Sequence, residues 1–442
     1  MRQVLQVAYN FPPSSAVGAL RAARFARDLP GFGWQPHLLV GRETQHPDPI
    51  PEWIDPAHVT WVSLPVTPGS NRASASTETA SPPAPGFKPV ASLVRWLKNC
   101  GRNPWQLLTE TPDSSVSWAR AARARARQLC RGQQFDALLS TGPPHSTHLV
   151  TLDLKRRYGW PWIADLRDPV ARHPWGERKN PWAKPLRLAL ERRIIHTADR
   201  VVLNSPGMLE DFRRHYGHLP AEKFHYIPNG ADDQLRQMVA TILAELPSPQ
   251  PRLAAGDASP PTLIHPGSLY HRRNPRNLMQ AIAILRQRGI PVRFTQVGAF
   301  KPEFEIPVLS RQLGIEDLVE IQAAVPRQEA YRRMANSQLL LLLQPDTELQ
   351  IPAKLYEFML FRRPILAISP SRSIQQVISD YQLGMTVDNH NPAELADTIA
   401  QLLQRYEEFR ASPGWDRAQV DFDGTRLSGQ LAQLLDDISP VR

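Results

Sequence analysis

Short apolar runs alternate with helical stretches along most of this chain, and this alternation constrains the fold more than any other feature. In the first half, the pattern predicts strands at 4–9, 37–40, 135–140, 162–165 and 200–204. Helices are expected between most of them, notably at 18–29, 146–158 and 184–197. Strands that alternate with helices build a parallel sheet with helices on both faces. We therefore expect an α/β domain in the first half.

The same alternation returns in the second half. Strands are expected at 262–265, 292–297, 318–322, 339–343, 365–368 and 385–387. Helices are expected to begin at Pro275, Pro326, Ala353, Ser373 and Pro392. Two α/β domains of similar size leave a cleft between the carboxyl ends of their strands, where ligands of such sheets bind. The sequence therefore predicts two parallel-sheet domains that face each other across a cleft.

Breaks in the pattern indicate the domain limits. A stretch rich in proline, serine and threonine at about 65–89 predicts a mobile surface insertion. A second proline-rich break at 247–261 follows the turn at 228–230. We place the N-terminal domain at 1–228 and the C-terminal domain at 229–420. The segment 421–442 contains a helical pattern, and we expect this helix to pack back on the N-terminal domain.

A lysine and a glutamate share one face of the helix predicted after the leucine run at 339–343. Lys354 and Glu357 are three residues apart, and Pro352 suits the start of the helix. The helix N-terminus and Lys354 can bind phosphate, while Glu357 can accept hydrogen bonds from ribose hydroxyls. The pair predicts a site for a nucleotide diphosphate. The alternative is an ordinary ion pair on the surface of an amphipathic helix.

Each half also has a loop that can approach a phosphate at the end of its first strand. In the first half, Gly18 opens a helix, and a glycine there lets backbone amides come close to an anion. The matching loop of the second half contains Gly267, Tyr270, Arg272 and Arg273. Because the guanidinium fork matches phosphate oxygens, we assign Arg273 to the diphosphate, together with Gly267 and Tyr270. Neither loop is a dinucleotide fingerprint or a Walker motif.

Polar residues follow two further strands of the first half. His145 can donate a hydrogen bond to a sugar hydroxyl or a phosphate near the reacting centre. His148 competes for this role, and we prefer His145 because two prolines precede it. One strand later come Asp165, Arg167 and Asp168. These three can bind a hydroxyl-rich or phosphorylated substrate, or they can form a self-contained ion-pair turn.

Composition narrows the class of protein. Fifty-two lysines and arginines against 42 acidic residues give a net charge of +10, which attracts polyanions in general. Two cysteines fit neither a disulfide framework nor a Cys-x-x-Cys metal site, so we expect a reducing cytoplasm. The histidines are scattered and no Asp-x-Asp pair follows a strand, so we expect no metal and no cofactor.

The stretch at 90–105 is basic and contains Trp96 and Trp105. Such a segment can lie on an anionic membrane surface, or it can pack as a core helix with a solvated basic side. No run of the chain is long enough to span a bilayer. We expect a cytoplasmic protein, attached to the inner face of the cell membrane if the stretch binds lipid.

Together these motifs resemble those of the retaining nucleotide-sugar glycosyltransferases of family 4 (group 1), which have the two-domain GT-B fold. The resemblance covers nearly the whole chain, from the loop before Gly18 to the helix with Lys354 and Glu357. It includes the segments around His145 and Asp165, the turn at 228–232 and the loop at 267–273. It implies two Rossmann-like domains, of which the C-terminal one binds the donor.

The resemblance also implies roles for the matching residues. Glu357 would hold the ribose, Arg273 and Lys354 would hold the diphosphate, and Gly18 would approach it from the other domain. Backbone near Val325 would meet the base, and His145 would lie beside the transferred sugar.

Two positions depart from the family pattern. The family's Glu-x7-Glu pair has its second member at Glu357, but Leu349 occupies the first position and Glu348 is one residue away. Ser268 follows the loop glycine where a basic residue is common. Both changes remove contacts to the sugar or the phosphate, so they bear on which donor the chain uses.

The implied reaction transfers a hexose-type unit from a nucleotide diphosphate-sugar to an acceptor hydroxyl with retention at the anomeric carbon. The leaving phosphate would help to deprotonate the acceptor, so positioning and electrostatic stabilisation would supply most of the rate. We expect a glycan or lipid-linked acceptor, in the synthesis of a cell-surface polysaccharide or glycolipid.

Two other functions are compatible with parts of the sequence. A nucleotide-sugar epimerase or a phosphorylase would use the same fold. A nucleic-acid-binding protein would account for the net charge and for Arg120, Arg123, Arg125 and Arg127. Those arginines are spaced around a helix and no nucleic-acid module is recognisable, so we expect no nucleic-acid partner.

Overall fold

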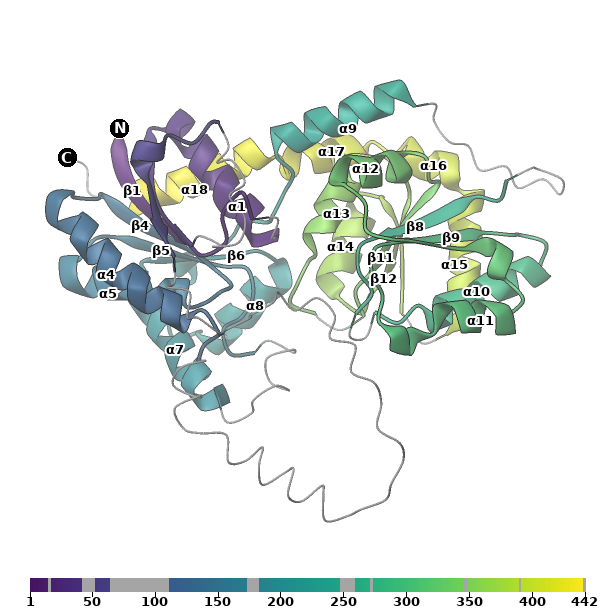
Figure 1. The fold of residues 1–442 in the computed structure, drawn as a ribbon, viewed down its shortest axis with the longest axis horizontal. Helices are drawn as coiled ribbons and strands as arrows, with labels where there is room; N and C mark the ends of the chain where they lie inside the picture. Colours follow the sequence, from purple (N-terminus) through teal and green to yellow (C-terminus); the bar gives the residue numbers. More distant parts are fainter. Residues whose placement is uncertain are drawn as a thin grey trace, which may run out of the picture. The chain divides into compact units, whose positions relative to one another are not determined.

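The computed structural model describes residues 1–14, 17–41, 52–63, 111–172, 183–246, 259–270, 273–345, 348–388 and 391–439. The predicted insertion at 65–89, the basic stretch at 90–105 and Arg272 lie outside these residues. The described elements form two parallel sheets with helices packed against them (Figure 1). Among the described helices, none has the length and apolarity needed to cross a bilayer.

The first sheet has seven strands. They are β1 (Arg2–Ala8), β2 (Trp34–Gly41), β3 (Val59–Val62), β4 (Ala137–Gly142), β5 (Trp162–Leu166), β6 (Arg200–Leu203) and β7 (Phe224–Tyr226). Their order across the sheet is β3-β2-β1-β4-β5-β6-β7. The helices along this part of the chain are α1 (Val17–Asp28), α4 (Val116–Gly132), α5 (Thr147–Tyr158), α7 (Lys184–Thr197) and α8 (Pro206–His215). Short 3-10 helices lie at Leu29–Phe32, Pro56–His58 and Ala221–Lys223.

The second sheet has six strands. They are β8 (Thr262–Pro266), β9 (Arg293–Val297), β10 (Val319–Gln322), β11 (Leu339–Leu343), β12 (Ile365–Ile368) and β13 (Gly384–Val387), in the order β10-β9-β8-β11-β12-β13. Six of its helices are α9 (Asp233–Glu245), α10 (Arg276–Gln287), α11 (Ile306–Gln312), α12 (Arg327–Ala335), α13 (Ala353–Phe358) and α14 (Arg372–Asp380). The chain ends with α15 (Pro392–Gln404), α16 (Tyr406–Arg410), α17 (Gly414–Asp421) and α18 (Gly424–Ile438). Short 3-10 helices lie at Pro302–Phe304 and Glu316–Leu318.

The leucine run of β11 shows why the second sheet is covered on both faces. Successive side chains of a strand point to opposite faces. Leu339, Leu341 and Leu343 join an apolar cluster with α10, α11, α15 and α16. Leu340 and Leu342 join another with α9, α12, α13, α14 and α17. A strand buried on both faces reads as a continuous apolar run, which is typical of a doubly wound parallel sheet.

All predicted strands are present, and the expectation of two Rossmann-like parallel sheets is confirmed. The strands β3 and β7 were not predicted. Both are short, and both are edge strands of the first sheet. By its contacts the chain divides into two compact units, Met1–Asp199 with Ile438–Arg442 and Arg200–Asp437. The second unit contains β6, β7 and the whole second sheet.

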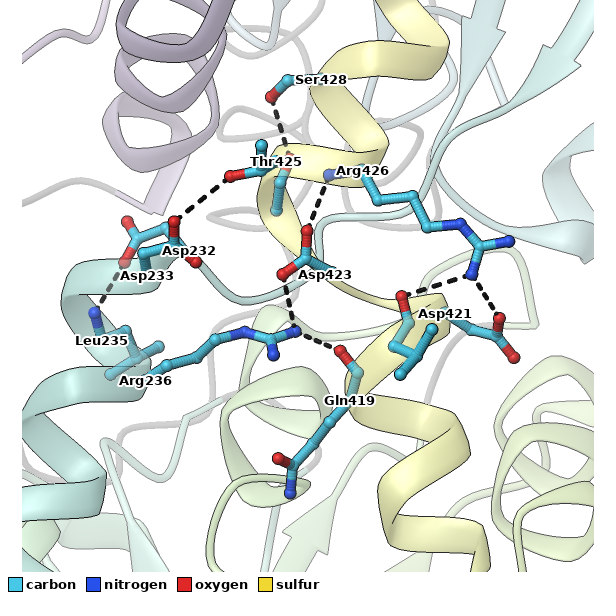
Figure 2. A network of polar contacts seen from close by, with 12 residues as sticks. Asp232, Asp233, Leu235, Arg236, Gln419, Asp421, Asp423, Thr425, Arg426 and Ser428 are labelled. Atoms are coloured by element: carbon cyan, nitrogen blue, oxygen red, sulfur yellow. Dashed lines mark hydrogen bonds and ion pairs between the residues drawn. The ribbon is translucent and has the colours of Figure 1, made fainter.

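Within the second unit, a polar network joins the start of α9 to the turn between α17 and α18 (Figure 2). Ala231 and Asp423 form an isolated parallel β-bridge. The Asp423 carboxylate accepts from the backbone N–H of Arg426 at 2.7 Å and pairs with Arg236 at 3.1 Å. Arg236 also donates to the backbone oxygen of Gln419. Two segments far apart in sequence are therefore fixed side by side.

Candidate functional site

In the second unit, a glycine turn and a lysine lie in direct contact. Gly267 follows β8 with φ +128°, a backbone conformation that L side chains rarely adopt. A Cβ at this position would lie 1.9 Å from Nζ of Lys354, which comes from α13. Gly298 follows β9 with φ +123°, and its Cβ would lie 2.9 Å from the carbonyl carbon of Gly267. The two glycine turns are therefore stacked, and the lysine ammonium rests on the first of them.

A buried glutamine holds both glycine turns in place. Gln296 Nε2 donates to the Gly267 oxygen at 2.6 Å and to the Gly298 oxygen at 3.3 Å. Its Oε1 lies 2.9 Å from Nδ1 of His265, which is also buried. Burial, together with the nearby Lys354 charge, lowers the pKa of His265 to about 3. His265 is therefore neutral at pH 7 and donates from Nδ1 to the glutamine oxygen.

Arg273 lies beside this turn, where the sequence predicted a diphosphate ligand. Its guanidinium stacks over the ring of Tyr270, with 4.5 Å between Cζ and the ring centroid. One of its nitrogens donates to Oε1 of Gln344, which follows β11 and is buried. The structure therefore fixes the guanidinium from two sides, through the loop's own tyrosine and through the next strand.

The pKa of Lys354 shows that these charges act on one another. Burial and, to a smaller extent, the Arg273 charge lower it from 10.5 to about 8, and the Glu357 carboxylate partly opposes them. Among the described residues, no carboxylate forms an ion pair with Lys354 or Arg273. Two neighbouring cations beside a glycine turn have the charge needed to neutralise an anion such as a diphosphate.

Glu357 lies one turn further along α13, and two side chains of α12 orient it. Tyr331 O–H donates to Glu357 Oε2 at 3.2 Å, and Arg327 Nη2 donates to Oε1 at 3.3 Å. Arg327 Nε also donates to the Tyr331 oxygen at 2.6 Å. Each carboxylate oxygen thus has one protein donor and keeps a lone pair for a hydroxyl group. Sequence reasoning found Glu357 but neither of the residues that hold it.

Three further positions of the second unit, Val325, Leu349 and Glu348, were discussed from the sequence. Their contacts are with other parts of the unit. Val325 is half-buried just before α12 and packs against the apolar cluster that contains Leu340. At the position that departs from the family pattern, the Leu349 backbone oxygen accepts from Ser205 Oγ at 2.6 Å. The Glu348 backbone oxygen accepts from Ser371 Oγ at 3.3 Å.

The first unit contains a second contact between a glycine and a cation. A Cβ at Gly18 would lie 2.4 Å from one guanidinium nitrogen of Arg167 and 2.7 Å from Cζ. Arg167 follows β5, and its side chain also donates to the backbone oxygen of Pro143. The guanidinium therefore links the start of α1 to the loop after β4.

Asp165 pairs with an arginine that the sequence analysis did not consider. Arg21 Nη2 lies 2.8 Å from Asp165 Oδ1, and Arg21 Nε lies 2.9 Å from Oδ2. Both side chains are buried, so the pair is a bidentate ion pair inside the unit. The pair is not a self-contained ion-pair turn, because the partner of Asp165 comes from α1 and not from the turn at 165–168. Burial lowers the pKa of Arg167, and the charge of the half-buried Asp168 opposes that shift.

The two candidate histidines stack against each other at the end of β4. His145 and His148 have ring centroids 5.9 Å apart, and both are buried. Trp162 Nε1 donates to Ser140 Oγ at 2.9 Å, and Ser140 Oγ lies 2.8 Å from His148 Nδ1. Burial lowers the pKa of His148 well below its usual range, with help from His145 and Arg167. His148 is therefore a neutral, buried residue that is hydrogen-bonded to Ser140, and its ring stacks against that of His145.

Among the described residues, no three or more His, Cys, Asp or Glu side chains are grouped so that they could hold a metal ion.

Comparisons with known proteins agree with this architecture. Residues 18–230 match the model of a glycosyl transferase 4-like domain, and residues 260–405 match that of the glycosyl transferases group 1. Sucrose-phosphate synthase from Thermosynechococcus elongatus has a similar fold, with TM-score 0.67, 16% identity and 99% of both chains covered. Anabaena Alr3699/HepE in complex with UDP-glucose has TM-score 0.60 and 16% identity, over 99% of this chain and all of that one. These structures define a GT-B glycosyltransferase fold.

Two curated relatives share sequence with part of the chain. The D-inositol 3-phosphate glycosyltransferase of Paenarthrobacter aurescens (strain TC1) is 24% identical over 218 residues, which cover 48% of this chain and 50% of the relative. The enzyme of the same name from Arthrobacter sp. (strain FB24) is 24% identical over 219 residues, or 48% and 49% of the two chains. The chain thus matches about half the length of these relatives. With the two domain matches, it belongs to the group 1 glycosyltransferases.

Proposed function

We propose that the chain transfers a sugar from a nucleotide diphosphate-sugar to an acceptor hydroxyl with retention of anomeric configuration. The observation that carries the proposal is the pairing of Lys354 and Arg273 on the Gly267 turn, with Glu357 one helical turn away. A diphosphate would neutralise both cations, and the ribose hydroxyls would donate to Glu357. Anabaena Alr3699/HepE, a structural neighbour, binds UDP-glucose, which is in keeping with this assignment.

The chemistry then depends on positioning and electrostatics. The leaving diphosphate gains negative charge as the bond to the sugar breaks, and Lys354 and Arg273 would stabilise that charge without a metal. Asp165 is a poor candidate for a general base, because Arg21 holds both of its oxygens. A leaving phosphate that accepts the acceptor's proton on the same face of the sugar would give retention.

The other predicted residues complete the proposed site. Backbone near Val325 would bind the base, and Gly18 would allow close approach to the diphosphate. His145 would donate to the transferred sugar. Arg167 and Asp168 would contact the acceptor, and Asp165 would act through Arg21 by ordering the start of α1. The proposed acceptor is a glycan or a lipid-linked saccharide of a cell-surface polysaccharide or glycolipid pathway, handled in the cytoplasm at the membrane surface.

The test combines donor binding with product analysis. Thermal-shift titrations with UDP-, GDP- and ADP-sugars should single out one nucleotide for the wild-type chain and none for Lys354→Ala or Glu357→Ala. Both variants should keep the wild-type circular dichroism spectrum and lose transfer. NMR of the product should show the donor's anomeric configuration. Inverted product, or full transfer by both variants, would contradict the proposal, and phosphate-dependent release of sugar phosphate would indicate a phosphorylase instead.

A further inference from the structure

The backbone after β8 turns one N–H group away from its neighbours. Gly267 N–H donates to the Val297 oxygen at 2.7 Å, and Leu269 N–H donates to the Ala299 oxygen at 2.8 Å. Both acceptors lie at the end of β9 or just beyond it. The Ser268 N–H comes between these two donors along the chain, and successive N–H groups of a strand-like backbone point to opposite sides. It therefore points away from β9.

The peptide plane between Gly267 and Ser268 gives the same direction. This bond is trans, because every cis bond among the described residues precedes a proline. In a trans peptide the C=O and N–H groups point in opposite directions. The Gly267 oxygen accepts from Gln296 of β9 at 2.6 Å, so the Ser268 N–H points to the opposite side. Because β8 lies between β9 and β11 in the sheet, that side is the side of β11.

The side of β11 also carries the cations of the proposed donor site. Arg273 donates to Gln344, the residue after β11. The Lys354 ammonium comes from α13, which follows β11, and lies against Gly267. Ser268 is exposed, and its N–H has no hydrogen-bond partner within the described residues. A backbone donor is thus open on the same side as the two charges.

Gln296 fixes the direction of this peptide. Its side chain is fully buried, and Nε2 also donates to the Gly298 oxygen at 3.3 Å. Its Oε1 accepts from Nδ1 of His265 at 2.9 Å, so the amide presents its NH2 group to the two glycine carbonyls. A glycine adopts many backbone conformations at little cost, so without this contact the peptide could turn over. The Gly267 oxygen would then face the cations in place of an N–H and would repel a phosphate.

Resting on the proposed transfer reaction, we infer that the Ser268 N–H donates to the diphosphate of the donor, and that Gln296 is the residue that positions it. The N–H would act beside Lys354 and Arg273 on the negative charge of the leaving group. A donor held in place before the reaction costs no reorganisation when that charge develops. The contact uses only the backbone, so it does not depend on the side chain at position 268.

The amide signal of Ser268 tests the contact directly. The sequence contains two Gly–Ser pairs, at 69–70 and 267–268. The full chain, made by cell-free synthesis with carbonyl-¹³C glycine and ¹⁵N serine, therefore gives two carbonyl-filtered amide signals in NMR, and Ser268→Ala identifies the one from position 268 by removing it. UDP and inorganic pyrophosphate should each move this signal downfield, because a phosphate oxygen accepts from the N–H. Uridine should leave it in place.

Gln296→Met tests the positioning role. Methionine keeps the length of the side chain and removes the amide, so UDP affinity should fall at least about tenfold, and saturating UDP should no longer move the Ser268 signal. Gln6→Met is a matched control, because Gln6 is also fully buried and donates to a backbone oxygen, that of Ala22 in the other unit, at 2.7 Å. Gln6→Met and Ser268→Ala should each change UDP affinity less than threefold.

The outcomes separate this inference from the proposed function. A Ser268 signal that stays in place while UDP binds would overturn the inference and leave the proposed donor site intact, even if Gln296→Met fails to fold. Wild-type UDP affinity and a wild-type shift in Gln296→Met would show that the glutamine does not position the peptide. A wild-type chain in which pyrophosphate moves the signal but no nucleotide diphosphate binds would instead contradict the proposed donor and leave the Ser268 N–H as an anion donor.

Discussion

The ammonium nitrogen of Lys354 occupies the space that any side chain at position 267 would need, 1.9 Å from the place of its Cβ. The glycine and the lysine are therefore interdependent. The glycine makes room for the cation, and the cation in turn places a positive charge on the turn.

A comparison of Gly267→Ala with Gly289→Ala should separate the cost of backbone strain from the effect of displacing Lys354. Both glycines have positive φ, but only Gly267 has a neighbour within 4 Å of the added Cβ. We expect Gly289→Ala to cost about 1 kcal/mol of unfolding free energy, from backbone strain alone, with normal UDP affinity. Gly267→Ala should cost at least as much and weaken UDP binding tenfold or more. Urea denaturation and UDP titration measure the two quantities, and equal UDP affinities in both variants would show that Lys354 does not depend on the glycine.

Nucleotide binding should weaken as the pH rises past the pKa of Lys354. This pKa is lowered from 10.5 to about 8, so the side chain of the ligand-free protein loses its charge near pH 8. UDP affinity should fall between pH 7 and 9 in the wild-type chain and stay flat in Lys354→Gln. A wild-type curve that matches the variant's curve would exclude Lys354 from the diphosphate site.

The lowered pKa of Lys354 also predicts how the unfolding free energy of the ligand-free protein depends on pH. Between about pH 8 and 10.5 the unfolded lysine holds its proton and the folded one does not, so the unfolded state binds more protons and stability rises with pH. Below about pH 8 both states are charged, and Lys354 contributes no slope. The difference in unfolding free energy between wild type and Lys354→Gln, measured from pH 7 to 10.5, isolates this contribution from other titrating groups.

Glu357→Gln should weaken the binding of UDP by about 10- to 100-fold, because a hydrogen bond to a charged group contributes about 1.5–3 kcal/mol. Tyr331→Phe should cause a smaller loss, since it removes only one of the two donors that orient the carboxylate. If the glutamate binds the ribose, its substitution should have little effect on a 2′,3′-dideoxy analogue of UDP. An equal loss for UDP and for the analogue would mean that Glu357 acts elsewhere.

Asp165→Asn should destabilise the fold by about 3–5 kcal/mol, because it leaves the buried Arg21 without its counter-ion. The double variant Arg21→Met with Asp165→Leu should recover much of that loss. The exposed pair of Arg286 and Asp317 is a matched control, and Asp317→Asn should cost less than about 1 kcal/mol. Chemical denaturation of the wild-type chain and of these three variants measures the changes in unfolding free energy. A loss below about 1 kcal/mol for Asp165→Asn would show that the pair is not a structural element.

Sequence patterns predicted those parts of the fold and the site that depend on residues close together in the sequence. The apolar runs predicted the central strands, because those strands are buried along most of their length. The spacing of Lys354 and Glu357 placed both on α13. The strands β3 and β7 escaped prediction because runs of four and three residues are too short to show a periodicity.

Contacts between distant residues could not be predicted in this way. Arg21 and Asp165 are 144 positions apart, and only the strand order brings α1 beside the end of β5. The residues behind the proposed donor site present the same problem. Gln296 shares its strand with the polar residues Arg293 and Thr295, so nothing in the sequence singled it out as the residue that contacts both glycine turns.

The bridge between Ala231 and Asp423 also bears on how enzymes of this kind can be re-engineered. The chain enters and leaves the intervening stretch at this bridge (Figure 2). Every second-unit residue that we assign to the donor lies between Ala231 and Asp423 in the sequence. A chimera would therefore need only two junctions, one at each side of the bridge. Exchanging this cassette between relatives should transfer nucleotide preference in a single step.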